Sequence, residues 1–209
     1  MDFKRVMEER RSIDWFDTNR PVTEHTLRQI VNLAALAPSS FNLQPWHLMV
    51  YKSPDARRRL YEAAGKDRKI LDAPVVLVVI GDKYGWQIAH PAAEQAWQSF
   101  VELGYMNDDL RDWYEQETQA LFGSERESTI FAVKNASLFA MSLMLAAKHF
   151  DVDSHPLGGF LRDEVAASLG IPPNFIVVML IAMGHLNKKY RVLPPKWRKS
   201  YDEIVLDTM

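Results

Sequence analysis

The feature that most restricts the fold of this chain is residues 128–150, STIFAVKNASLFAMSLMLAAKHF, which are apolar almost all the way round a helix. A helix that is hydrophobic on every side must be buried, either inside a protein or in a membrane. Lys134 and Asn135 interrupt this stretch and leave it too short for a membrane span. We therefore expect residues 128–150 to form a central buried helix, and we expect no contact with a membrane.

The pattern of apolar residues predicts an α+β fold around this helix. Residues 74–80 and 175–183 are continuously apolar and predict two strands buried on both faces, and residues 46–51 alternate as a third strand would. A weaker alternation over 201–206 predicts a final edge strand. The strands are too few for a regular βαβ array, and no repeat or flexible linker divides the chain, so we expect a single domain over 1–209. Helices are predicted over residues 2–11, 23–37, 53–64, 91–103, 107–121 and 161–169.

Composition and missing motifs exclude several classes of function. The net charge of −2 gives no reason to expect a nucleic acid partner, and the chain has 0 Cys, which excludes disulfides, thiolate metal sites and a Cys nucleophile. The N-terminus does not resemble a signal peptide, so we expect a cytoplasmic protein. The histidines lack metal-site spacing, so no metal is expected, and neither a nucleophile elbow nor a dinucleotide or P-loop fingerprint occurs. If the chain is an enzyme, a bound organic cofactor should carry the difficult step.

Basic residues gather in three places although the chain is acidic overall. Residues 188–200 contain six basic residues and no acid, whereas residues 101–127 contain eight acids. An ordinary solvated surface explains any one cluster, but three clusters raise the alternative that they converge on one anion. The basic residues are Lys4, Arg5, Arg10 and Arg11; Lys66, Arg68 and Lys69; and Lys188, Lys189, Arg191, Lys196, Arg198 and Lys199.

The segment APSSFNLQPW, residues 37–46, places two Ser, an Asn and a Gln between two prolines. The simplest interpretation is a helix stop followed by a loop, because Pro38 ends the preceding helical pattern and Ser and Asn favour turns. Such a loop also offers short neutral hydrogen-bonding groups to a ligand, and the local sequence does not decide between the two.

Several motifs taken in order resemble the nitroreductase family of FMN-dependent oxidoreductases. They are ERRSIDWF (9–16), APSSFNLQPWHLMVY (37–51), KDRKILDAPVVLVV (66–79), HPLGGF (155–160), GHLNKK (184–189) and LPPKWRKSYDEIV (193–205). Each motif is weak alone, but together they cover essentially the whole chain. The resemblance implies a central, mostly antiparallel sheet flanked by helices, an intertwined homodimer, FMN at the subunit interface, and NAD(P)H as electron donor.

The resemblance also implies which residues bind FMN. Arg10, Arg11, Ser12, Lys196 and Arg198 would hold the phosphate and ribityl chain, since several fixed donors suit a dianion. The loop residues Pro38, Ser39, Ser40 and Asn42 would reach the flavin from the neighbouring subunit. Asn42 and Gln44 as simple turn residues remain an alternative. Along the flavin ring the resemblance implies a backbone contact from Pro156, Leu157, Gly158 and Gly159.

Three charged residues bear on the reduced flavin. Lys69 resembles the family's basic residue beside the ring and would stabilise reduced flavin electrostatically, with a solvated Lys as the alternative. Asp14 stands where relatives often carry a basic residue, so either it points away or the flavin potential is lower. Lys66 replaces a frequent Asn, and our hypothesis is that it supplies the missing positive charge at the cofactor site.

No side chain is expected to act as a general acid or base, because the chemistry is centred on the flavin. The expected function is ping-pong transfer of two electrons from NADH or NADPH to a nitroaromatic, quinone or similar small-molecule acceptor. Gln44, Tyr105 and Trp113 are candidate substrate contacts, although core packing is the alternative for either aromatic. Alternative functions are a specialised flavin enzyme, such as a dehalogenase or a flavin-fragmenting enzyme, and a non-catalytic FMN-binding module.

Overall fold

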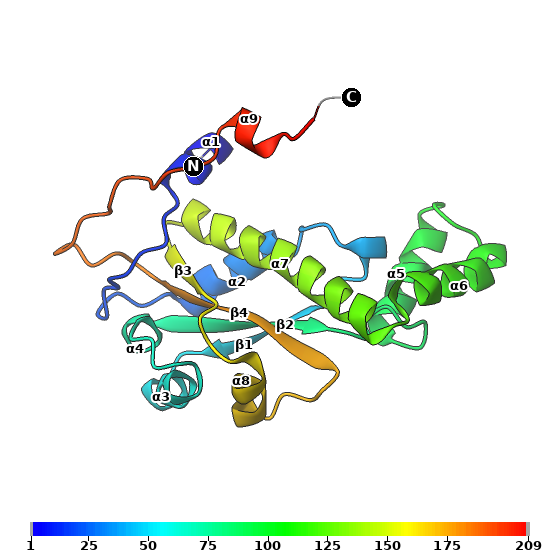
Figure 1. The fold of residues 1–209 in the computed structure, drawn as a ribbon, viewed down its shortest axis with the longest axis horizontal. Coiled ribbons are helices and arrows are strands. Elements are labelled where there is room, and N and C mark those ends of the chain that lie inside the picture. The colour runs from blue at the N-terminus through cyan, green and yellow to red at the C-terminus, as the bar shows by residue number, and fades with distance from the viewer. Residues whose placement is uncertain (1, 208–209) are drawn as a thin grey trace.

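The computed structural model describes residues 2–207 and has a four-stranded antiparallel sheet between two layers of helices (Figure 1). The strands are β1 (Trp46–Tyr51), β2 (Val75–Asp82), β3 (Asp153–Leu157) and β4 (Phe175–Gly184), in the order β1-β2-β4-β3. The central strand β2 is buried along its whole length, as its unbroken apolar sequence predicts. The expected α+β architecture is confirmed.

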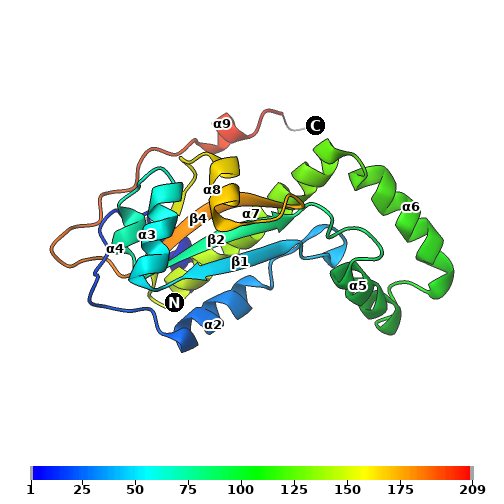
Figure 2. The ribbon, with the colours of Figure 1, turned by 90° about the horizontal axis from the view of Figure 1, so that it is seen from below.

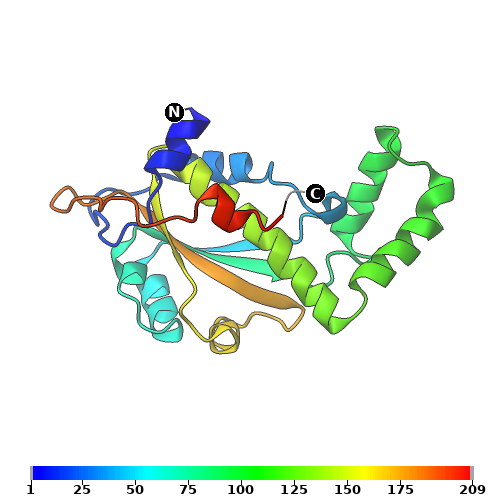
Figure 3. The same cartoon turned by 45° about the horizontal axis from the view of Figure 1, so that its top comes forward.

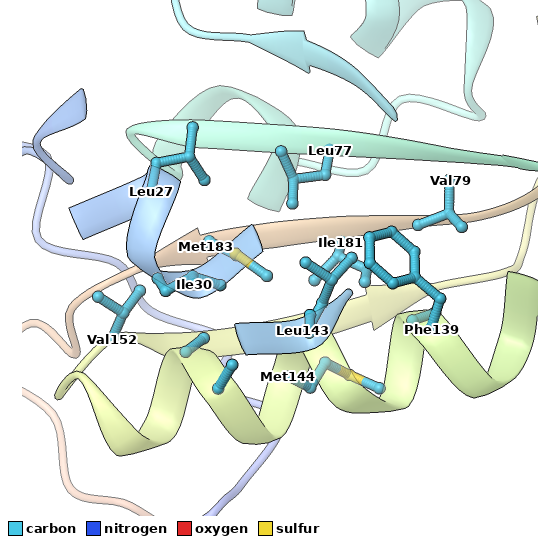
Figure 4. Packing of buried hydrophobic residues seen from close by; sticks show 14 of the residues in the cluster. Leu27, Ile30, Leu77, Val79, Phe139, Leu143, Met144, Val152, Ile181 and Met183 are labelled. Atoms are coloured by element: carbon cyan, nitrogen blue, oxygen red, sulfur yellow. The ribbon is translucent and has the colours of Figure 1, made fainter. Parts of the chain in front are cut away.

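The two faces of β2 belong to two separate cores. Val75, Leu77 and Val79 pack against α2 (Glu24–Ala34) and α7 (Glu125–His149), as Figure 4 shows for Leu77 and Val79. Val76 and Val78 face the second core. Three helices contribute to that core: α3 (Pro54–Ala63), α4 (Lys69–Asp72) and α8 (Arg162–Leu169). The alternation of side chains along a strand thus divides one continuous apolar run between two helical layers.

The long helix α7 fills the role expected of the most apolar stretch. The expectation that this stretch is too short for a membrane span is wrong, because the helix begins at Glu125 and is long and apolar enough for one by length and composition. Phe139, Leu143 and Ala147 nevertheless pack in the core against the sheet. Buried residues recur along α7 every three or four positions, which is the spacing of a helix face packed in a core. We therefore assign α7 as the core helix of this domain.

Two helices project from one end of the sheet, where Figure 2 shows them separated from the main layers. They are α5 (Pro91–Glu102) and α6 (Arg111–Phe122). A small aromatic core at their base includes Trp86, Phe122 and Phe131.

Most elements agree with the sequence-based prediction, but the C-terminal tail and β3 differ from it, and the short helix α4 was not predicted. The prediction of a final edge strand is wrong, because Tyr201–Ile204 form a short helix, α9, whose first turn has a capping box between Ser200 and Glu203. The strand β3 was not predicted, because DSHPL has no apolar alternation and contains Pro156. Pro is tolerated there because β3 is an edge strand of the sheet, next to β4. The first helix, α1, covers Phe3–Glu9.

Candidate functional site

The segment that follows α1 lies along the edge of the sheet. Arg10 caps the end of α1, and Ser12 forms a parallel bridge with Ser154 of β3. The Ile13 amide donates to the Ser154 carbonyl at 3.2 Å, so the edge strand fixes the direction of this segment. Arg10 and Arg11 come immediately before this pairing with Ser154. The edge of the sheet therefore fixes the position of their backbone.

Five basic residues from the two ends of the chain line one cavity of about 180 Å³: Arg10, Arg11, Arg191, Lys196 and Arg198. Burial, and then the charges of Arg11 and Arg198, lower the pKa of Arg10. Such mutual repulsion shows that these guanidinium groups are close enough to interact. Within residues 2–207, none of the five forms an ion pair with an acid. The cavity therefore has positive charge that an anion would balance.

Arg11 presents a further donor. Its Nη1 atom donates to the backbone carbonyls of Glu8 at 2.6 Å and Arg10 at 2.9 Å. Its Nε atom is buried and has no hydrogen-bond partner among the described residues. Buried donors without acceptors are rare in folded proteins, so they suit a bound ligand that carries oxygen atoms.

A second cluster of charges lies beside this cavity and centres on Lys69, at the start of α4. The Lys69 ammonium is 3.2 Å from an Asp67 carboxylate oxygen and 3.7 Å from one of Asp14, which itself lines the cationic cavity. Asp14 also lies 3.4 Å from Nδ1 of His155. Lys69 is therefore paired with two carboxylates and is not a free solvated lysine, and Asp14 lies between Lys69 and the cationic cavity.

His155 is held in one orientation by the N-terminal segment. Its Nδ1 atom lies 2.8 Å from the Ile13 carbonyl, so Nδ1 carries a proton and donates to that oxygen. Burial lowers the His155 pKa more than the hydrogen bond to Ile13 raises it. The imidazole is consequently neutral at neutral pH.

The Pro156–Gly159 segment runs past this cluster. Pro156 and Leu157 end β3, and a side chain added at Gly158 or Gly159 would meet no atom within 4 Å. A Cβ at Gly65 would lie 3.3 Å from the Gly159 carbonyl, so the turn before α4 and the end of β3 are in contact. Lys66 has a left-handed backbone with φ of 58° and pairs with Glu62 at 3.3 Å. Its ammonium is thus engaged with α3, and its role at a cofactor remains a prediction.

The Pro38–Gln44 loop has a backbone that needs support from outside. Phe41, Asn42 and Gln44 have positive φ values of 51°, 51° and 47°, which side-chain-bearing residues seldom adopt. Asn135, buried in α7, accepts a hydrogen bond from the Ser40 amide at 2.9 Å, and the Ser39 hydroxyl accepts one from the Gln44 amide at 2.9 Å. Strain held in this way is typical of functional loops.

Within one chain, this loop lies far from the cationic cavity. Figures 1 and 2 show the pale-blue loop before β1 beside α5, at the opposite end of the sheet from α4. A separate cavity of about 470 Å³ is lined by Asn42 and Gln44 of the loop and by α5 residues including Gln95 and Ser99. A single chain therefore brings Arg10, Arg11, Ser12, Asp14, Lys69, Lys196 and Arg198 together, but not with Pro38, Ser39, Ser40 or Asn42.

The candidate acceptor contacts lie on or beside the projecting helices. Tyr105, between α5 and α6, is 76% exposed, and Trp113 on α6 is 48% exposed. These two rings do not belong to the core, so the packing alternative is excluded for them in the described structure. Tyr114, the next residue, is the ring that packs inward.

Two contributors were not assigned a role from the sequence. Arg191 lines the cationic cavity, and Asn135 anchors the loop. The signal for Asn135 was its position as a polar interruption in an apolar helix, because a buried amide needs partners.

Comparison with known proteins identifies this architecture. The model of the nitroreductase family matches residues 7–185. The chain belongs to the nitroreductase family. Among its relatives is MhqN of Bacillus subtilis, named as an NAD(P)H nitroreductase, which is 34% identical over 98% of this chain and 98% of its own length.

Solved nitroreductase structures agree with the fold over nearly the full chain. The Bacillus subtilis nitroreductase ydfN superposes with a TM-score of 0.88 at 33% identity, covering 99% of this chain and 98% of its own. A nitroreductase from Exiguobacterium sibiricum, solved in complex with FMN, has a TM-score of 0.81 at 27% identity and covers 98% of this chain and 96% of its own. The nitroreductase-like fold expected from the sequence motifs is thus confirmed.

Proposed function

We propose that this protein is an FMN-dependent oxidoreductase that passes two electrons from NAD(P)H to a small electron-poor acceptor by a ping-pong mechanism. Nitroaromatic compounds and quinones are the acceptor classes we propose. The observation that carries the proposal is the cavity lined by Arg10, Arg11, Lys196 and Arg198 without a paired acid. The names of the relatives, as NAD(P)H nitroreductases and as an FMN complex, support the same activity.

The donor set fits the phosphate end of FMN. Guanidinium groups match phosphate oxygens in geometry, and the buried Arg11 Nε atom offers one further donor that has no acceptor among the described residues. Ser12 lines the same cavity and would contact the ribityl chain. These residues would bind and orient the cofactor and take no part in proton transfer.

Bound FMN would supply the two-electron chemistry, accepting electrons from NAD(P)H and delivering them to the acceptor. We infer that Lys69 stabilises the additional negative charge of the reduced cofactor. Asp67 fixes the ammonium at 3.2 Å, so little reorganisation is needed when that charge appears. The open side of Gly158 and Gly159 lets the backbone approach a planar ring closely.

We further propose that two copies of the chain complete each site as an intertwined homodimer. The separation of the Pro38–Asn42 loop from the cationic cavity supports this arrangement, because both groups are expected to contact one cofactor. The tail supports it too, since all of residues 188–204 are exposed although they include Leu193, Trp197 and Ile204. A second copy would cover these apolar side chains.

We propose that the electron acceptor contacts Gln44, Tyr105 and Trp113. The amide of Gln44 lines the cavity beside α5, and the exposed rings of Tyr105 and Trp113 could stack on planar acceptors. NAD(P)H and the acceptor would bind at this place in turn, which is compatible with a ping-pong mechanism.

The first experiment tests the cofactor. We expect the purified protein to carry about one FMN per chain and its visible bands to bleach on anaerobic addition of NADH or NADPH. Arg198→Ala should weaken FMN binding by about 10- to 100-fold, as loss of a charge-assisted hydrogen bond implies. The control Arg126→Ala removes an exposed arginine of α7 that contacts only Glu127 among described acids, and it should bind FMN normally. A colourless protein that takes up no added FMN would contradict the proposal.

Subunit complementation tests the two-chain site. Asn42→Ala and Arg198→Ala should each weaken FMN binding when expressed alone. Co-expressed, they form heterodimers in which one site receives both intact groups and the other receives neither. We expect about half of the FMN content to return in the isolated heterodimer, as the symmetry of a two-site dimer dictates. No recovery would mean that each chain builds its own site.

Product analysis separates the alternative functions. A non-catalytic module would bind FMN but show no acceptor-stimulated consumption of NAD(P)H. A dehalogenase or flavin-fragmenting enzyme would show a different product from the reduced nitroaromatic or quinone.

A further inference from the structure

Asp14 connects the two charged groups of the candidate site. It lines the same cavity as Arg10 and Arg11, and its Oδ1 atom lies 3.7 Å from Nζ of Lys69. Its carboxylate is 55% exposed, whereas the Lys69 side chain is 21% exposed. Asp14 therefore faces the space in which a cofactor would lie and contacts the lysine at its border.

Lys69 has more negative charge around it than it can neutralise. Asp67 approaches the ammonium to 3.2 Å, and Asp14 approaches it from the cavity. Two carboxylates face one ammonium, so their formal negative charge exceeds its positive charge. The neighbouring His155 does not offset this charge, because its imidazole donates to Ile13 in its neutral form.

The two carboxylates differ in what else they do. Asp67 accepts a hydrogen bond from the Lys69 amide at 2.9 Å and so caps the start of α4. Among the described residues, the side chain of Asp14 accepts no hydrogen bond that holds a helix or turn together. Its contacts are the charge pair with Lys69 and the close approach to His155. Replacing Asp14 by Asn therefore changes charge while leaving the helix cap intact.

We propose that the carboxylate of Asp14 lowers the reduction potential of bound flavin by offsetting the positive charge of Lys69. This inference rests on the proposed function. Reduction adds electrons to the cofactor, and a nearby carboxylate disfavours the more negative form relative to the oxidised one. A bound cofactor also displaces water from the cavity, which weakens the screening of Asp14. The flavin becomes a stronger reductant than Lys69 alone would make it.

The test measures the midpoint potential of bound FMN in the intact holoprotein. For Asp14→Asn we expect reduced FMN to gain about tenfold in affinity relative to oxidised FMN, which raises the potential of a two-electron couple by about 30 mV. Asp14→Glu keeps the charge and should hold the potential close to that of the unchanged protein. The control Asp55→Asn removes an exposed carboxylate in the first turn of α3, outside the residues that line the cationic cavity, and should have no effect.

A second readout needs no flavin. In the apoprotein, the carboxylate of Asp14 helps to raise the pKa of His155 against burial, so Asp14→Asn should lower that pKa further in an NMR titration. The His155 signal is assigned by its loss in His155→Gln.

The outcomes are separable. Asp14→Asn protein that holds FMN at an unchanged potential overturns this inference and leaves the proposed function intact. A potential raised equally by Asp14→Asn and Asp14→Glu also overturns it, because charge would not be the cause. An unchanged His155 pKa overturns the contact itself. Failure of the unchanged protein to bind FMN would overturn the proposed function, and this inference with it.

Discussion

Single buried polar groups determine the local geometry of this protein. Asn135 is 1% exposed in the most apolar helix, yet every polar atom of its amide has a partner: its oxygen accepts from the Ser40 amide, and its nitrogen donates to the Phe131 carbonyl at 2.8 Å. The amide connects the core helix to the strained loop that carries Ser39, Ser40 and Asn42. Removing one partner of such a bond leaves the other unsatisfied, which costs more than the bond itself contributes.

We expect Asn135→Leu to lower the free energy of unfolding by about 1–3 kcal/mol, since Leu has a similar volume but leaves the Ser40 amide without an acceptor. The measurement is the midpoint of urea denaturation. Ser142→Ala in the same helix is the matched control, because its hydroxyl bonds only to the Leu138 carbonyl and is exposed. A midpoint equal to that of the control would contradict the role of Asn135.

The lowered pKa values of two histidines, His155 and His185, predict how the stability of the protein depends on pH. Burial lowers the pKa of His155 and of His185 below their ordinary value of 6.5. Below that value the unfolded chain binds more protons than the folded protein, so the free energy of unfolding falls as pH falls through the window under 6.5. Urea denaturation at pH values on either side of this window should show the loss. His155→Gln should reduce the dependence, and an unchanged dependence would assign it to other groups.

At the scale of elements, the edge of the sheet and the projecting helices carry the candidate site. Sequence patterns predicted β1, β2 and β4, because their side chains alternate or are wholly apolar, but not β3, where Pro156 and His155 interrupt any pattern. The tail was predicted as a strand and forms α9, since the capping box of Ser200 and Glu203 satisfies the first turn of a helix. Short elements with few apolar residues depend on local hydrogen bonds more than on periodicity.

The helix α6 is attached to the rest of the protein through aromatic contacts. Tyr114 is fully buried and lies 5.5 Å from Phe41 of the strained loop and 5.2 Å from Trp97 of α5, measured between ring centroids. Its hydroxyl has no partner among the described residues, and burial raises its pKa to about 12. The ring rather than the hydroxyl should therefore stabilise the contact.

We expect Tyr114→Phe to keep the free energy of unfolding or raise it by about 1 kcal/mol, because a hydroxyl without a partner is removed. Tyr114→Ala should lower it by about 3–5 kcal/mol through loss of the buried ring. Thermal or urea denaturation of both variants distinguishes the two groups. A marked loss of stability in Tyr114→Phe would mean that the hydroxyl has a partner, such as an ordered water.

At the scale of the whole molecule, the C-terminal tail, residues 188–204, carries exposed apolar side chains. Figure 3 shows the path of this tail in orange and red. Trp197 is 72% exposed and Ile204 65% exposed. A single chain has no means to bury them in this arrangement. The proposed homodimer would bury them, and it would bring the loop of one chain to the cavity of the other.

We therefore expect Ile204→Asp to shift the protein from dimer towards monomer in light-scattering measurements over a range of concentrations, because a charge would enter an apolar interface. FMN content should fall in parallel, since each proposed site takes residues from both chains. Leu103→Asp, at a position 69% exposed at the end of α5, is the matched control and should remain dimeric. Equal behaviour of the two variants would contradict the place of the tail in the interface.

The sequence by itself determined the core helix, the three patterned strands and the family, because these follow from continuous apolar runs and from short motifs that each lie within a few adjacent residues. Only the tertiary structure decided which charges meet. It brought residues 10–14, Lys69 and residues 191–198 to one edge of the sheet, paired Asp14 with Lys69, engaged Lys66 with Glu62, and left the Pro38–Gln44 loop at the opposite end. Periodicity reports the face of an element on which a side chain lies, whereas distances between charges on different elements depend on how the whole chain packs.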